Sequence, residues 1–161
     1  MIPKEPFFNY KYFLNFDTED SKKLKNGNCI SNEVSFSPPY SSLQKGPDTY
    51  SAMFESVMKD LGIGSPSEIT TININAKIYS VDSVINSVMV FTIEDPSGKN
   101  LLWLGKDITN FNYPIGKWNE EKFSFPMTVR SAMDGNNKIS IYLWNRGKGK
   151  VYLDDLLVTM Y

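Results

Sequence analysis

A strict alternation of apolar and polar side chains runs from Thr71 to Tyr79, and it constrains the fold more than any other feature of the sequence. Every second residue of this segment is apolar, namely Ile72, Ile74, Ala76 and Ile78. Successive side chains of a β-strand point to opposite faces of a sheet. The pattern therefore predicts a strand with one buried face.

Similar short runs follow along the chain, and turn-forming residues separate them. The segments 95–98 and 134–137 combine Asp with Gly, Pro or Asn, which preset or tolerate the backbone angles of turns. Strands are expected at 71–79, 87–94, 101–105, 118–125, 138–145 and 151–161. Short, regularly spaced strands predict an all-β fold, an antiparallel β-sandwich (jelly roll) of about 8–10 strands.

The first third of the chain has a weaker pattern. Strands are expected at 7–14 and 28–36, and the Pro-containing segment 37–42 is expected to be a surface loop. Residues 51–61 fit both a helical stripe and an alternation, and we predict a strand over 50–57.

A length of 161 residues suits a single domain over 1–161, with residues 1–6 as a flexible N-terminal extension. Hydrophobic residues make up 41% and charged residues 22%, which excludes disorder as the main state. The net charge of -1 argues against nucleic acid as the main partner. No run approaches the roughly 18 apolar residues of a membrane span, so we expect no membrane insertion.

The chain contains no histidine, which excludes Ser-His-Asp and Cys-His catalysis and histidine-ligated metals. Cys29 is the only cysteine, so there is no internal disulfide and no thiolate metal cluster. No phosphate-binding or nucleophile-elbow motif occurs, and spacing selects no pair of acids for glycoside hydrolysis. We therefore expect a protein that is not an enzyme.

Two adjacent acids, Asp154 and Asp155, interrupt an otherwise apolar last strand. A buried carboxylate must be paired, coordinated or protonated, because isolated burial is costly. Calcium is one solution, since it binds oxygen ligands and needs neither His nor Cys. A Lys or Arg partner and the capping of backbone amides are the others.

The C-terminal half resembles the jelly-roll carbohydrate-binding modules of the galactose-binding-like superfamily, which are accessory domains of bacterial proteins. The resemblance rests on 72–79 followed by 88–94, on Gly116-Lys117-Trp118, and on the ending 141–145 and 151–156. It implies a structural Ca²⁺ held by the first Asp of the closing strand, here Asp154, with Asp17 as the ligand near the chain start.

Sugar binding needs flat aromatic faces, with polar groups at their edges. Tyr142 and Trp144 share one face of the strand 138–145, whose other face is aliphatic and is expected to be the core side. Trp103 lies in mid-strand, and the loop residues Tyr40, Phe111 and Tyr113 offer an alternative platform. A tryptophan taken singly is more often a packing residue than a ligand contact.

These features lead to the hypothesis of a non-catalytic carbohydrate-binding module whose partner is a polysaccharide or oligosaccharide. We expect an extracellular or cell-surface location and further domains in a longer chain. The alternative is a structural or protein–protein interaction β-sandwich with no glycan ligand, which buried tryptophans would favour.

Overall fold

The structure, a computed structural model, describes residues 10–17, 24–63 and 65–161. Eleven strands are described: β1 (Tyr10–Leu14), β2 (Ile30–Ser31), β3 (Ser41–Lys45), β4 (Thr49–Tyr50), β5 (Phe54–Val57), β6 (Thr71–Ser80), β7 (Ile85–Glu94), β8 (Asn100–Asn110), β9 (Trp118–Pro126), β10 (Lys138–Asn145) and β11 (Lys150–Met160). The described helices are short 3₁₀ turns, at Gly27–Cys29, Met58–Leu61, Pro66–Glu68 and Arg130–Ala132. No helix in these ranges is long and apolar enough to span a membrane.

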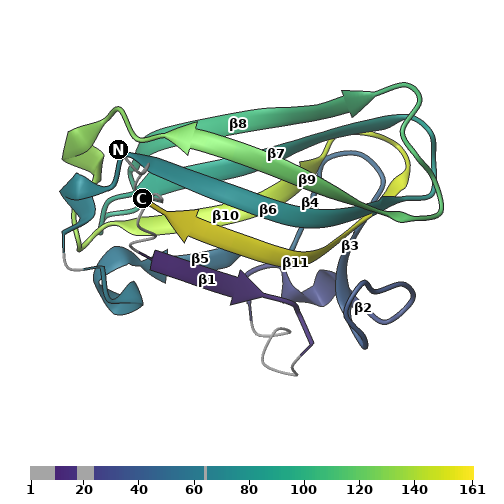
Figure 1. Ribbon diagram of the computed structural model, residues 1–161, viewed down its shortest axis with the longest axis horizontal. Helices are drawn as coiled ribbons and strands as arrows, with labels where there is room; N and C mark the ends of the chain where they lie inside the picture. Colours follow the sequence, from purple (N-terminus) through teal and green to yellow (C-terminus); the bar gives the residue numbers. More distant parts are fainter. Residues whose placement is uncertain (1–9, 18–23, 64) are drawn as a thin grey trace, which may run out of the picture.

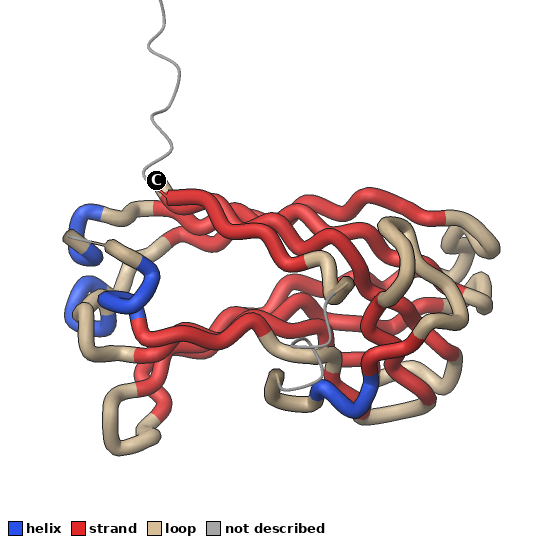
Figure 2. Tube along the Cα trace, turned by 90° about the horizontal axis from the view of Figure 1, so that it is seen from below, coloured by secondary structure: helices blue, strands red, loops and turns tan. Residues whose placement is uncertain are grey.

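The strands form two antiparallel sheets that face each other, as Figures 1 and 2 show. The first sheet has the order β2-β3-β11-β6-β9, and β1 also pairs with β11. The second sheet has the order β4-β10-β7-β8, and β5 also pairs with β10. The prediction of an all-β antiparallel sandwich is confirmed.

The core lies between the two sheets and is built by alternation. In β6 the four apolar residues of the predicted pattern are buried, and the polar residues between them are half-buried on the opposite face. In β10 the aliphatic residues Ile139, Ile141 and Leu143 are buried in the same way. Phe91 and Phe125, from different sheets, pack with their ring centroids 6.0 Å apart.

The first third differs most from the sequence-based expectation. Within the predicted strand 28–36 only Ile30–Ser31 is a strand, and the predicted loop 37–42 ends inside β3. The predicted strand 50–57 is divided into β4 and β5, which pair with different ends of β10. Short edge strands carry too few alternating positions to be recognised by periodicity. The expected extension 1–6 lies outside the described residues.

Truncating a core side chain of β11 tests the assignment of its faces. Leu153 is fully buried between the sheets, so Leu153→Ala is expected to lower the free energy of unfolding by about 2–5 kcal/mol. Leu157 lies half-buried on the same strand and is the matched control, for which Leu157→Ala should cost clearly less. Urea unfolding of both variants measures the difference, and equal losses would contradict the assigned faces.

Candidate functional site

The outer face of the second sheet carries the aromatic residues of β10. Because Ile139, Ile141 and Leu143 point into the core, the alternate residues of the strand point outward. These are Lys138, Ser140, Tyr142 and Trp144, and Arg146 continues the same series past the strand end. Tyr142 and Trp144 are both half-buried.

A third ring, that of Tyr50, joins them from β4. Tyr50 pairs with Trp144 in the strand register, and the two rings stack with centroids 6.0 Å apart and planes at 24°. The Tyr50 ring also meets Tyr142 edge-on at 5.7 Å. Tyr50 is 41% exposed. A two-residue edge strand has no periodicity of its own, so the sequence pattern did not point to this residue.

Trp103 reaches the same face from β8, on the other side of β7. Its ring lies over Gly105, which pairs with Val90, and Val90 in turn pairs with Tyr142, so the two rings approach each other across β7. The indole lies over Gly105, where a Cβ atom would come within 2.7 Å of Trp103 Cη2. Glycine at position 105 is therefore needed for this ring position. We call Tyr50, Trp103, Tyr142 and Trp144 the aromatic platform.

The platform covers an apolar floor and lies between two polar ends. Val88 and Val90 of β7 pair with Trp144 and Tyr142 and are buried although they belong to the outer face. At one end the Lys138 ammonium contacts carboxylates of Glu94 and Glu55 at 3.3 and 3.5 Å. A partly exposed aromatic surface with charged groups at its ends thus lies on this sheet.

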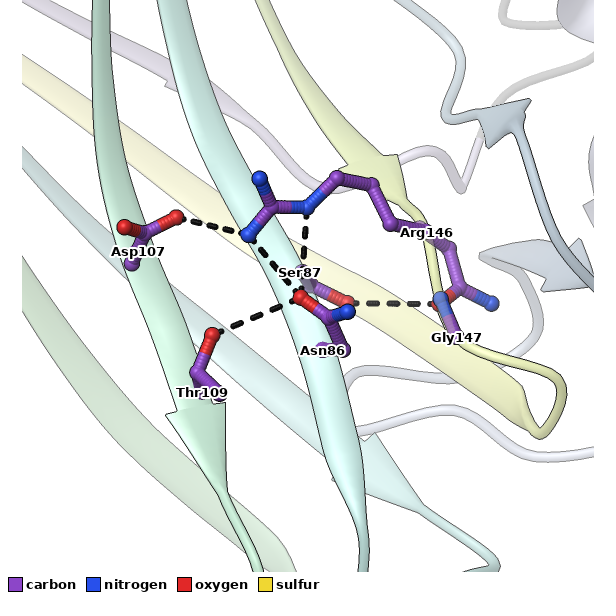
Figure 3. Close-up of polar contacts among 7 residues, drawn as sticks. Asn86, Ser87, Asp107, Thr109, Arg146 and Gly147 are labelled. Atoms are coloured by element: carbon purple, nitrogen blue, oxygen red, sulfur yellow. Dashed lines mark hydrogen bonds and ion pairs between the residues drawn. The ribbon is translucent and has the colours of Figure 1, made fainter.

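Arg146 forms the other polar end (Figure 3). Its Nη2 donates to Asn86 Oδ1 at 2.9 Å and to Asp107 Oδ1 at 2.8 Å. Its Nε donates to the same Asn86 oxygen at 3.2 Å. The guanidinium carbon lies 5.6 Å from the centre of the Trp144 ring, within cation–π range. These contacts hold the guanidinium beside the platform.

Tyr50 also borders a cavity of about 570 Å³ that extends to Cys29, Ser31 and Thr49. Burial raises the pKa of the Cys29 thiol, although hydrogen bonds from Ser42 and neighbouring groups oppose this effect. The thiol is therefore neutral at pH 7 and is not an activated nucleophile.

The other candidate residues lie elsewhere. Tyr113 is buried and donates to Glu121 Oε1 at 2.9 Å, so its ring is not an accessible surface. Phe111 is 80% exposed in the loop after β8. Tyr40 precedes β3, and its backbone N–H donates to Asp17 Oδ1 at 3.2 Å. Trp118 is half-buried on the first sheet, where it packs against Tyr79.

Asp154 is fully buried, but not in the core between the sheets. It pairs with Lys77 on the outer face of the first sheet, and segment 32–40 covers it there. A β-bulge between Asp154 and Leu157, with Asp155 at φ 45°, then changes the alternation of the strand. This bulge explains why a plain period of two could not assign the faces of the two acids.

Backbone amides satisfy the Asp154 carboxylate. Its Oδ2 accepts from the N–H groups of Phe36 and Ser37 at 2.8 and 3.1 Å, and its Oδ1 accepts from Asp155 N–H at 2.8 Å. The sequence left three ways to accommodate this buried carboxylate: a cation, a basic side chain, or the capping of backbone amides. The structure shows the capping of backbone amides. Burial raises the pKa of Asp154 to about 7, and the three N–H bonds offset only part of this effect.

The chemistry of the residues around Asp154 is compatible with a hard cation. Asp17 and Asp154 both accept amide N–H bonds from segment 36–40, so the two ends of the chain meet the same segment. Carboxylate oxygens are the ligands that Ca²⁺ prefers. Within the described ranges no group of three metal-ligating side chains occurs, and Thr18, Glu19 and Asp20 lie outside those ranges.

The stability of the protein should depend on pH through Asp154. The folded protein keeps a proton on this group up to about pH 7, whereas the unfolded chain releases it near pH 3.8. Stability should therefore fall as pH rises between these values, by at most about 1.4 kcal/mol per pH unit. No histidine titrates in this window. Urea unfolding at pH 5 to 8 in EDTA measures the slope, and Asp154→Asn should flatten it; an equal slope in the variant would contradict the assignment.

The chain matches no protein-family model and no curated protein sequence. Solved structures do resemble it. The C-terminal family 22 carbohydrate-binding module of Clostridium thermocellum Xyn10B is 13% identical, with a TM-score of 0.50, and the match covers 81% of this chain and 79% of that one.

Two further structures have the same architecture. A carbohydrate-binding module of the β-sandwich superfamily is 15% identical with a TM-score of 0.51, over 79% of this chain and 50% of that one. The xylanase 10B modules of Clostridium thermocellum, in complex with xylohexaose, are 9% identical with a TM-score of 0.50, over 94% of this chain and 24% of that one. The predicted resemblance is confirmed at the level of the fold: the chain is a jelly-roll β-sandwich with the architecture of carbohydrate-binding modules.

Proposed function

We propose that the chain is a non-catalytic carbohydrate-binding module that binds a polysaccharide or oligosaccharide on the aromatic platform. One observation carries the proposal. Three of the residues selected from the sequence as candidate ligand contacts, Trp103, Tyr142 and Trp144, lie on one outer face together with Tyr50. Aromatic faces bury the C–H surface of sugar rings, and the polar ends supply hydrogen bonds to hydroxyl groups.

The exposure of the tryptophans favours binding over a purely structural role. Trp103 is 47% exposed, and Trp118 and Trp144 are half-buried. Fully buried tryptophans would have favoured the alternative, a β-sandwich with no glycan ligand. Carbohydrate-binding modules among the structural neighbours support the proposal, and one of them is joined to a xylanase module in a structure complexed with xylohexaose. An extracellular or cell-surface location, as an accessory domain of a longer chain, accords with it.

Removing a platform ring should weaken glycan binding. Affinity electrophoresis in gels containing xylan, β-glucan, mannan or pectin identifies the ligand, and calorimetry then measures its affinity. Trp103→Ala is expected to lower the affinity about tenfold or more, because it removes the most exposed ring of the platform. Gly105→Ala should have a similar effect, since the added Cβ displaces that ring.

Phe13→Ala is the matched control, because Phe13 is 58% exposed on β1 of the other sheet. Its affinity should equal that of the unchanged protein. The proposal fails if no polysaccharide retards the protein, or if Trp103→Ala binds as tightly as Phe13→Ala.

We also propose a structural Ca²⁺ at Asp154 and Asp17. The shared contact of both carboxylates with segment 36–40 supports it. EDTA should then lower the melting temperature and Ca²⁺ should restore it, by roughly 3 °C for each kcal/mol of binding free energy. Asp154→Ala should not respond to calcium, whereas Asp60→Ala, which removes an exposed acid, should respond normally. An unchanged melting temperature with and without EDTA would exclude the site.

A further inference from the structure

A cavity of about 560 Å³ lies at the end of the second sheet, next to Arg146. The connection between β6 and β7 and the connection between β10 and β11 form its walls. Its lining includes Asp82, Ser83, Asn86, Arg146, Lys148 and Gly149. The volume is within the range of roughly 300–1,000 Å³ that is usual for small-molecule sites.

The wall formed by residues 146–149 is rigidly attached to the sheet. The backbone N–H groups of Arg146 and Gly147 both donate to Asn86 O, at 2.9 and 3.0 Å. The side chain of the buried Asn145 holds the turn from inside: its Nδ2 donates to Gly149 O at 2.8 Å, and its Oδ1 accepts from Gly147 N–H at 3.0 Å. Because these residues are already ordered, they lose little conformational entropy when a ligand binds in the cavity.

The charged lining groups carry no net charge once the ion-pair partner of Arg146 is counted. Arg146 is paired with Asp107 at 2.8 Å, so this pair adds no net charge. The remaining charged groups, the Asp82 carboxylate and the Lys148 ammonium, have opposite signs. Together with the Ser83 hydroxyl they offer both acceptors and donors without a net charge. This combination suits a neutral ligand with several hydroxyl groups better than a phosphate or a uronate.

The cavity and the aromatic platform share one side chain. Arg146 lines the cavity, and its guanidinium carbon also lies 5.6 Å from the centre of the Trp144 ring. Because Tyr50 and Arg146 both lie against the Trp144 ring, a glycan on the platform would rest on the exposed rings of Tyr50 and Trp103, and its next sugar past Arg146 would reach the cavity. Resting on the proposed function, we propose that the cavity holds the terminal neutral sugar of the glycan chain whose inner rings lie on the aromatic platform.

Gly149 allows Asp82 to reach its position in the cavity. A Cβ atom at residue 149 would come within 2.0 Å of Asp82 Oδ2 and 3.0 Å of its Cγ. The backbone of Gly149 is outside the left-handed region, so alanine is sterically allowed there except for this contact. Gly149→Ala therefore displaces the Asp82 carboxylate and leaves the platform unchanged. Gly135→Ala is the matched control, because its added Cβ meets only Lys59 Cβ at 3.6 Å.

The test uses the full chain with xylohexaose, cellohexaose, mannohexaose and hexagalacturonate as probes. Calorimetry measures the affinities, and amide NMR signals of Gly147 and Gly149 report on the cavity during titration. We expect both signals to shift with a neutral hexasaccharide. Gly149→Ala and Asp82→Ala should each weaken binding about tenfold, and Gly135→Ala should bind like the unchanged protein.

Three results would overturn the inference. If the tryptophan indole signals shift while the Gly147 and Gly149 amides do not, and Gly149→Ala and Asp82→Ala both bind normally, binding is confined to the platform and the proposed function survives. If hexagalacturonate binds more tightly than every neutral probe, the cavity selects charge instead. If no hexasaccharide binds or shifts any signal, the proposed function fails, and the inference fails with it.

Discussion

The burial of one face of β10 is the constraint on which the rest of the site depends. Ile139, Ile141 and Leu143 leave water by packing between the two sheets, and this burial is the main source of stability for the strand. Because side chains alternate, the same packing directs Tyr142, Trp144 and Arg146 outward. The part of the platform that β10 supplies, and the position of Arg146 beside the cavity, therefore follow from the alternation of this strand.

Two glycines, Gly105 and Gly149, are important here because they have no side chain. Gly105 leaves room for the Trp103 indole to cross toward Tyr142, and Gly149 leaves room for Asp82. Neither glycine has a positive φ, so both positions are required by the space around them. Their roles depend on neighbours from other strands, and no local sequence pattern reveals them.

Asp154 shows how a buried carboxyl group is accommodated by backbone amides. Segment 32–40 crosses the outer face of the first sheet and presents the amides of Phe36 and Ser37 to the carboxylate. Nearby, the Tyr152 hydroxyl donates to Glu33 Oε2 at 2.8 Å, and Phe36 packs edge-on against Trp118. The acid therefore anchors an irregular segment to the last strand, joining residues more than a hundred positions apart.

The sequence by itself determined the fold class and the orientation of β10, because a period of two is a local property and burial follows from it. It also selected Trp103, Tyr142 and Trp144 as candidate ligand contacts, and it marked Asp154 and Asp155 as acids within an apolar strand. Only the tertiary structure brought Tyr50 onto the same face, buried Tyr113, and placed Asp154 under segment 32–40. These outcomes depend on contacts between distant strands and on one bulge in β11, and neither is expressed in the spacing of neighbouring residues.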